Sequence, residues 1–254
     1  MSFLQASSVT KTLETVAREF AEEIKSTIVK ALPVKTTNLG VRLSEKDGRG
    51  RVVLETSEPI ELSCDNRPLL YLAIKYHFTL NGTHSFLKVE SSSFCVLPSK
   101  SGNPLFRYEY LDAPSDSTPS AHLHVHGHRD EIVKLLYVSE RSRSNRVQSS
   151  NAREKGMVDP KKVKHLAELH FPLGGPRFRP CLEDVVELLI VEFGVDSGDD
   201  WRIAIQEGRR AWREKQFRTA VWDDPETARA ALAQFDELQD KANETKREER
   251  VVQF

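Results

Sequence analysis

Histidine stands at every second position of one short stretch, and this alternation restricts what the stretch can form. The stretch runs from Ala121 to His128 and reads Ala-His-Leu-His-Val-His-Gly-His. Successive side chains of a strand point to opposite faces, whereas a helix repeats about every 3.6 residues, so the alternation predicts a strand. The histidines would share one face of a sheet, and Leu123 and Val125 would be buried on the other. We therefore expect a sheet that contains this strand.

The region before the histidine strand also carries strand patterns. Segments 69–80 and 83–96 are rich in β-branched and aromatic residues and flank Asn81-Gly82, a dipeptide typical of two-residue hairpins. A two-residue turn would fix the register and place Ile74 opposite Val89, so that two apolar side chains share a face. Shorter strands are predicted over 51–55, 60–63 and 105–111.

Helical periodicity is present at both ends of the chain. Apolar residues at three- and four-residue spacing predict an amphipathic helix over 8–32, which Pro33 ends. Three more helices are predicted over 181–193, after Asp200 and from Pro225, the last with Leu232 on its inward face. The predicted fold class is α+β: an antiparallel sheet of about five to seven strands, an N-terminal helix and three C-terminal helices.

Composition divides the chain into three parts. Residues 139–164 hold eight basic and three acidic residues but few large apolar ones, a composition typical of a flexible loop. We expect the first helix and the sheet within residues 1–138. Residues 165–254 would hold a strand that returns to the sheet and then the C-terminal helices, because a strand over 166–171 is too short to form a sheet alone.

Charge and cysteine content restrict the class of protein. The formal net charge is -1, so any binding of nucleic acid would depend on local basic groups. Three widely separated cysteines form neither a disulfide framework nor a CxxC metal site. No apolar run is long enough to span a membrane, and the N-terminus lacks a signal-peptide pattern. We expect a cytoplasmic protein with no membrane partner.

The histidine strand is suited to acid–base chemistry. If the strand over 105–111 is its neighbour, Arg107 and Glu109 lie on the histidine face. Imidazole titrates near neutral pH, so His124 and His126 could act as acid and base while an arginine stabilises charge on phosphate. The predicted catalytic group is His122, His124, His126, Arg107, Glu109 and His170.

Metal binding is the second chemistry that the strand could support. Two alternating histidines can hold one ion such as zinc if a third ligand comes from elsewhere. The predicted metal-binding histidines are His124, His126 and His128, of which two would act together, with Glu109, Glu168 or His170 as the third ligand. The alternative is that the histidines face solvent or are hydrogen-bonded to a carboxylate, in which case they would neither catalyse a reaction nor bind a metal.

A glycine- and arginine-rich segment before the helix at 181–193 predicts a phosphate site. Glycine backbones can direct N–H groups at an anion, arginines can bind phosphate through two hydrogen bonds, and the next helix begins nearby. The predicted phosphate-binding residues are Gly174, Gly175, Arg177 and Arg179. We expect His170 or Arg177 to lie within reach of the histidine strand and form one shared site. An ordinary turn is the alternative.

The sequence His122-Leu-His124-Val-His126 resembles the signature of the histidine-triad nucleotide hydrolases and transferases. Gly127-His128 stands where that family has two apolar residues. The resemblance implies that His124 attacks phosphorus, with His122 and His126 orienting it and assisting the leaving group.

A broader stretch is similar to uncharacterised bacterial proteins of toxin–antitoxin and phage-defence neighbourhoods. The similarity lies in Phe106-Arg107-Tyr108-Glu109, the histidine cluster and Leu169-His170-Phe171-Pro172. It implies RNA or another phosphate ester as the target and a cognate antitoxin or other partner protein. The leading hypothesis is therefore a phosphodiester-directed hydrolase, such as a ribonuclease-like toxin. A metal-binding protein and a non-catalytic interaction module are the alternatives.

Overall fold

One antiparallel sheet forms the centre of the computed structural model, which describes residues 2–34, 37–46, 48–80, 87–127, 171–174 and 177–238. The eight strands follow the order β1-β2-β4-β5-β6-β7-β8, and β3 pairs with β4. Their bounds are β1 Leu39–Lys46, β2 Arg49–Thr56, β3 Ile60–Cys64, β4 Arg67–Leu80, β5 Leu87–Leu97, β6 Phe106–Leu111, β7 Ala121–Val125 and β8 Phe171–Pro172.

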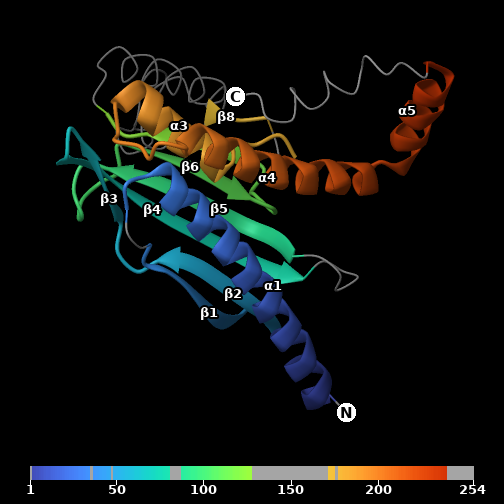
Figure 1. Cartoon of the computed structure of the whole chain (residues 1–254). Helices are drawn as coiled ribbons and strands as arrows, with labels where there is room; N and C mark the ends of the chain where they lie inside the picture. The colour runs from blue at the N-terminus through green and yellow to red at the C-terminus, as the bar shows by residue number, and fades with distance from the viewer. Residues whose placement is uncertain are drawn as a thin grey trace, which may run out of the picture.

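Helices cover one face of this sheet, and the last of them extends beyond it (Figure 1). Their bounds are α1 Ser2–Ala31, α3 Leu182–Phe193, α4 Trp201–Asp223 and α5 Pro225–Leu238. The predicted α+β class is confirmed, including the N-terminal helix and the three C-terminal helices, and the sheet has one strand more than the expected range. No helix in the described part of the chain is both long and apolar enough to cross a membrane.

The apolar stripe of α1 packs on the central strands and forms much of the core. Leu13, Ile24 and Ile28 are buried, as the periodicity predicted, although the helix begins at Ser2 rather than Ser8. Phe20 meets the rings of Tyr76 and Phe78 edge-on, with centroids 5.5 and 5.2 Å apart. Burial of large aromatic side chains is a major source of folding free energy, so this contact holds α1 on the sheet.

The pairing of β4 with β5 differs from the predicted hairpin. Ile74 lies opposite Phe94 rather than Val89, so the register predicted from a two-residue turn at Asn81-Gly82 is wrong. Residues 81–86 lie outside the described part. The observed register turns Phe94 and Val96 into the core. A slip by an odd number of residues would move them to the other face.

A β-bulge allows two apolar runs of β5, one at odd-numbered and one at even-numbered positions, to face the same core. His77 lies opposite Ser91 and Phe78 opposite Val89, so Glu90 is the extra residue. Before the bulge the odd-numbered Val89 faces the core, and after it the even-numbered Phe94 does. A strict alternation could not bury both runs, so the bulge lets the whole strand contribute to the core.

The C-terminal helices differ in how much of their apolar side-chain surface is buried. Asp184 accepts a hydrogen bond from the backbone N–H of Cys181 at the start of α3, at 2.9 Å, and Gly194 ends the helix in a left-handed conformation. Trp201 and Trp212 of α4 face the core as predicted. The predicted inward face of α5 is wrong, because this helix lies beyond the end of α4, away from the sheet (Figure 1), and Leu232 is 62% exposed.

The chain comes back to the sheet at β8. Phe171 and Pro172 pair antiparallel with Leu123 and His122 of β7, and the N–H of Leu173 donates to the carbonyl of Ala121 at 2.9 Å. The rest of the strand predicted over 166–171, and the basic segment 139–164, lie outside the described residues. The described part of the return strand places the histidine strand between two neighbours.

Candidate metal centre

The pairing of β6 with β7 places the acidic, basic and histidine side chains of the site. Arg107 lies opposite His124, and Glu109 lies opposite His122. Tyr108 packs with the core on the helix-covered face, so Glu109 and its neighbours point from the other face. The structure thus brings Arg107 and Glu109 to the histidine face, as the sequence predicted.

One carboxylate oxygen joins the cluster. Glu109 Oε2 lies 3.4 Å from His122 Nε2, 3.2 Å from His124 Nε2 and 3.0 Å from Arg107 Nη2. The two imidazole rings meet edge-on with centroids 4.8 Å apart. Ligand atoms of Glu109, His122 and His124 lie within 4.8 Å of one another, close enough to bind a metal ion.

A backbone carbonyl fixes the orientation of His122. Its Nδ1 lies 2.8 Å from the carbonyl oxygen of Pro119. Because a carbonyl oxygen only accepts, the Nδ1–H group donates this bond and Nε2 is the nitrogen that faces Glu109. Metal-binding histidines commonly use one nitrogen this way, which sets the tautomer and the ring plane for the other.

The two histidines are more deeply buried than the apolar residues that alternate with them. His122 is 1% exposed and His124 6%, whereas Leu123 and Val125 are only partly buried. The expectation that Leu123 and Val125 are fully buried is therefore wrong. The helices cover the central strands most completely, and β7 lies close to the edge of the sheet.

His126 stands apart from the three ligand atoms. It follows the last residue of β7, four residues after His122, and its backbone N–H donates to the carbonyl of Leu105 at 2.8 Å. Burial, followed by the charges of Arg107 and His124, lowers the pKa of His126. Among the described residues the metal set is thus Glu109, His122 and His124. The predicted set of His124, His126 and His128 differs from it.

Several predicted participants lie outside the described part of the chain. They are His128, Glu168, His170 and Gly175. Gly174 is described and adopts a left-handed conformation with φ of 65°. A Cβ there would lie 3.0 Å from the carbonyl oxygen of Phe178, so this glycine serves a tight turn.

The two predicted phosphate-binding arginines lie on the opposite side of the sheet from the histidines. The guanidinium carbon of Arg179 lies 3.7 Å from the ring centroid of Tyr110, a buried residue of the helix-covered face. Arg177 pairs with Asp223 of α4 at 2.6 Å. Arg177 is therefore not within reach of His124, because the segment before α3 lies on the helix-covered side of the sheet. The alternative expectation, that His170 reaches the histidine strand, lies outside the described residues.

Sequence reasoning missed the structural support of the cluster. It identified Glu109 and the histidines but not the carbonyl of Pro119, since a backbone contact three residues away leaves no pattern in side-chain types. It ranked His126 above His122 as a metal ligand because alternation alone does not show where a neighbouring carboxylate lies.

Comparison with protein-family models, curated proteins and solved structures found no match. The similarity to toxin-like proteins and to the histidine-triad family stays a prediction. A function for this chain has to be argued from the geometry of its sites.

Proposed function

We propose that Glu109, His122 and His124 form a divalent-metal centre, with zinc as the preferred ion, and that the protein hydrolyses phosphodiesters at this centre. The observation that carries the proposal is the convergence of two buried imidazole nitrogens on one carboxylate oxygen, at 3.4 and 3.2 Å. Arg107 supplies a neighbouring positive charge.

The hydrogen bond from His122 to Pro119 favours a cation at the cluster. With its hydrogen on Nδ1, neutral His122 presents an electron pair from Nε2 toward the negative Glu109 oxygen. Arg107 balances part of the charge of this oxygen, and the electron pair of Nε2 would stabilise a second cation beside it. That cation is either a second proton on the imidazole or a metal ion, and the two alternatives can be tested separately.

The donor set favours zinc over calcium or magnesium. Imidazole nitrogen suits zinc and other transition metals, whereas calcium and magnesium prefer oxygen ligands. Two histidines and one glutamate form a known ligand set of catalytic zinc, which leaves one position for water or substrate. Bound zinc would supply a water activated near neutral pH and polarise a phosphoryl oxygen.

The residues of the chain would hold and orient the substrate. Arg107 is partly exposed and lies beside Glu109, so its guanidinium can pair with a phosphate oxygen through charge-assisted hydrogen bonds. His126 follows directly after β7 and is the candidate to accept a proton from the attacking water. His124 keeps its Nε2 toward Glu109 in this scheme, so it serves as a ligand rather than as the nucleophile of the triad resemblance.

Metal binding is tested on protein without a histidine tag. Chelator-treated protein is titrated with zinc chloride, and thermal unfolding is followed. An ion that binds the folded state stabilises it by about 2.7 kcal/mol at a hundred times its Kd. Glu109→Gln and His124→Asn should abolish this shift. His77→Asn is the matched control. His77 lies on the same face of the sheet as the metal centre, and its ring is hydrogen-bonded to Ser91.

Equal zinc shifts in the wild type, Glu109→Gln and His77→Asn would contradict the metal centre. The cluster would then be a structural pair of histidines hydrogen-bonded to Glu109.

If zinc binds, hydrolysis of bis(4-nitrophenyl) phosphate and of a single-stranded RNA tests the activity. We expect Glu109→Gln to lower kcat/KM by about a hundredfold or more, equivalent to about 2.7 kcal/mol. Zinc-loaded protein that hydrolyses neither substrate faster than Glu109→Gln would overturn the hydrolase proposal alone.

A further inference from the structure

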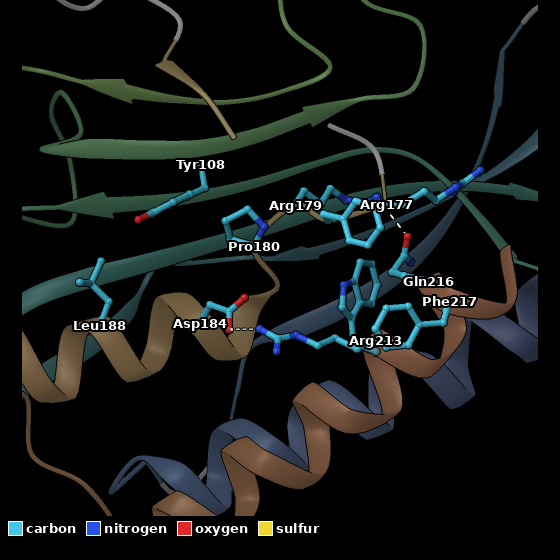
Figure 2. A pocket seen from close by; sticks show the side chains of 11 residues that line it. Tyr108, Arg177, Arg179, Pro180, Asp184, Leu188, Arg213, Gln216 and Phe217 are labelled. Carbon is cyan, nitrogen blue, oxygen red and sulfur yellow. Dashed lines mark hydrogen bonds and ion pairs between the residues drawn. The ribbon is translucent and has the colours of Figure 1, made fainter. Parts of the chain in front are cut away.

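A cavity lies on the helix-covered side of the sheet. Its volume is about 520 Å³, within the range of small-molecule sites. β6, α3, α4 and the segment before α3 form its walls (Figure 2). Glu109 and the two histidines point from the opposite face, so this cavity is separate from the proposed metal centre.

A buried cation forms one wall of the cavity. Arg179 is 7% exposed, and its guanidinium carbon lies 3.7 Å from the Tyr110 ring and 5.1 Å from the Trp212 ring. Its Nη1 donates to Gln216 Oε1 at 3.3 Å (Figure 2). Burial lowers the pKa of Arg179 to about 10, so the side chain is still charged near neutral pH.

Positive charge exceeds negative charge around the cavity. Three arginines line it, Arg177, Arg179 and Arg213, against the single carboxylate of Asp184. That carboxylate also accepts hydrogen bonds from Arg209 at 2.7 Å and from the N–H of Cys181 at 2.9 Å. Arg177 also pairs at 2.6 Å with Asp223, which lies outside the lining. The guanidinium groups of Arg179 and Arg213 are therefore the cations that would attract an anion into the cavity.

Aromatic and aliphatic side chains form the rest of the wall. Phe178 is 70% exposed and Phe217 is 43% exposed. Tyr108 of β6 and Leu188 of α3 line the end of the cavity away from Phe217 (Figure 2). Large apolar surfaces beside arginines suit a flat ring, which can stack on aromatic or guanidinium planes.

From these features we propose that the cavity binds a small organic anion that carries a planar ring, of the mononucleotide class. The phosphate would lie toward Arg179 and Arg213, and the ring would lie against Phe217 and Phe178. The volume admits one such ligand. The proposal does not depend on the metal centre.

Isothermal titration calorimetry with adenosine monophosphate, adenosine and inorganic phosphate tests the proposal. We expect the monophosphate to bind at least about tenfold more tightly than either part alone, because only it fills both halves of the cavity. Arg213→Gln should weaken its binding about tenfold or more. Arg218→Gln is the matched control on the same helix, because Arg218 is exposed and outside the cavity lining. Phe217→Ala should weaken binding of the monophosphate but not of phosphate.

Arg213 is chosen because it is partly exposed, whereas replacing the buried Arg179 would also disturb folding. Glu109→Gln should bind the monophosphate as the wild type does, which separates this proposal from the metal centre. Absence of monophosphate binding would overturn the inference. Equal weakening by Arg213→Gln and Arg218→Gln would also overturn it, since this would indicate general surface attraction. Equal affinity for phosphate and the monophosphate would overturn the ring subsite and with it the ligand class.

Discussion

Glu109 and His122 lie directly opposite each other on β6 and β7, and their Oε2 and Nε2 atoms are 3.4 Å apart. Both residues are in regular strands, so the ladder sets their separation without the closure of a loop. Sites built on strands hold their groups more accurately than sites on loops. The proposed metal centre is therefore expected to exist in its binding geometry before any ion arrives.

The first prediction concerns the stability that Glu109 provides without metal. Glu109→Ala should reduce the free energy of unfolding by about 1–3 kcal/mol in the presence of a chelator, because it removes the ion pair with Arg107 and the contacts to two buried imidazoles. Urea denaturation measures the change. Glu61→Ala, at an exposed position of β3, should change stability by less than about 0.5 kcal/mol. Equal changes in the two variants would show that the contacts to Glu109 are not stabilising.

The second prediction concerns His77 and acid. Burial, followed by the charges of Arg51 and Lys75, lowers the pKa of His77 to about 4 from the ordinary value of 6.5. Between these two pH values the unfolded chain binds the proton and the folded chain does not. The free energy of unfolding should therefore fall as pH decreases from 6.5 to 4, and this contribution should be absent above pH 6.5.

His77→Asn should remove this part of the pH dependence. Urea denaturation at several pH values between 4 and 7 compares the two slopes, with each protein referred to its own stability at pH 7. The Asn side chain can still contact Ser91, which limits other changes. An unchanged slope in His77→Asn would contradict the assignment.

The third prediction concerns the contact that holds α1 on the sheet. Phe20→Ala should cost about 3–5 kcal/mol, because it removes a buried ring that meets Tyr76 and Phe78. Val29→Ala on the exposed side of α1 should change stability by less than about 0.5 kcal/mol. Chemical denaturation of both variants provides the comparison. A small loss in Phe20→Ala would mean that α1 is attached mainly by other contacts.

The fourth prediction is a change opposite to helix propensity. Alanine normally stabilises a helix interior relative to glycine by about 1 kcal/mol. At Gly208 of α4, however, a Cβ would lie 2.7 Å from Glu183 Oε1 and 2.9 Å from Thr27 Oγ1. Gly208→Ala should therefore destabilise the protein by about 1–3 kcal/mol. Gln206→Ala, at an exposed position of the same helix, should leave the free energy of unfolding nearly unchanged. A Gly208→Ala protein that is more stable than the wild type would disprove the close packing of α1, α3 and α4.

Much of the fold follows from local patterns in the sequence. The periodicity of α1, the ends of α3 and the alternation of β7 each depend on neighbouring residues, and the structure confirms them. Glu109 could also be placed beside the histidines, because two short strands with a short connection usually pair. These features need no knowledge of distant contacts.

The errors arose where distant contacts decide the outcome. The register of β4 and β5 depends on which residues of β5 best fill the core, and the bulge at Glu90 changes that alternation. The side of the sheet that Arg177 and Arg179 reach depends on where α3 packs. The amphipathic pattern of α5 predicted an inward face, but the helix extends away from the sheet.

Pro172 of β8 gives the histidine strand a further property. It pairs with His122 on the outermost strand of the described part of the sheet, yet it has no N–H group to donate to another chain. A proline at such a position offers no donor for the addition of a strand from a second molecule. Because β8 pairs with His122 and Leu123, the buried histidine beside Glu109 lies on a stretch of β7 that has a neighbouring strand on each side.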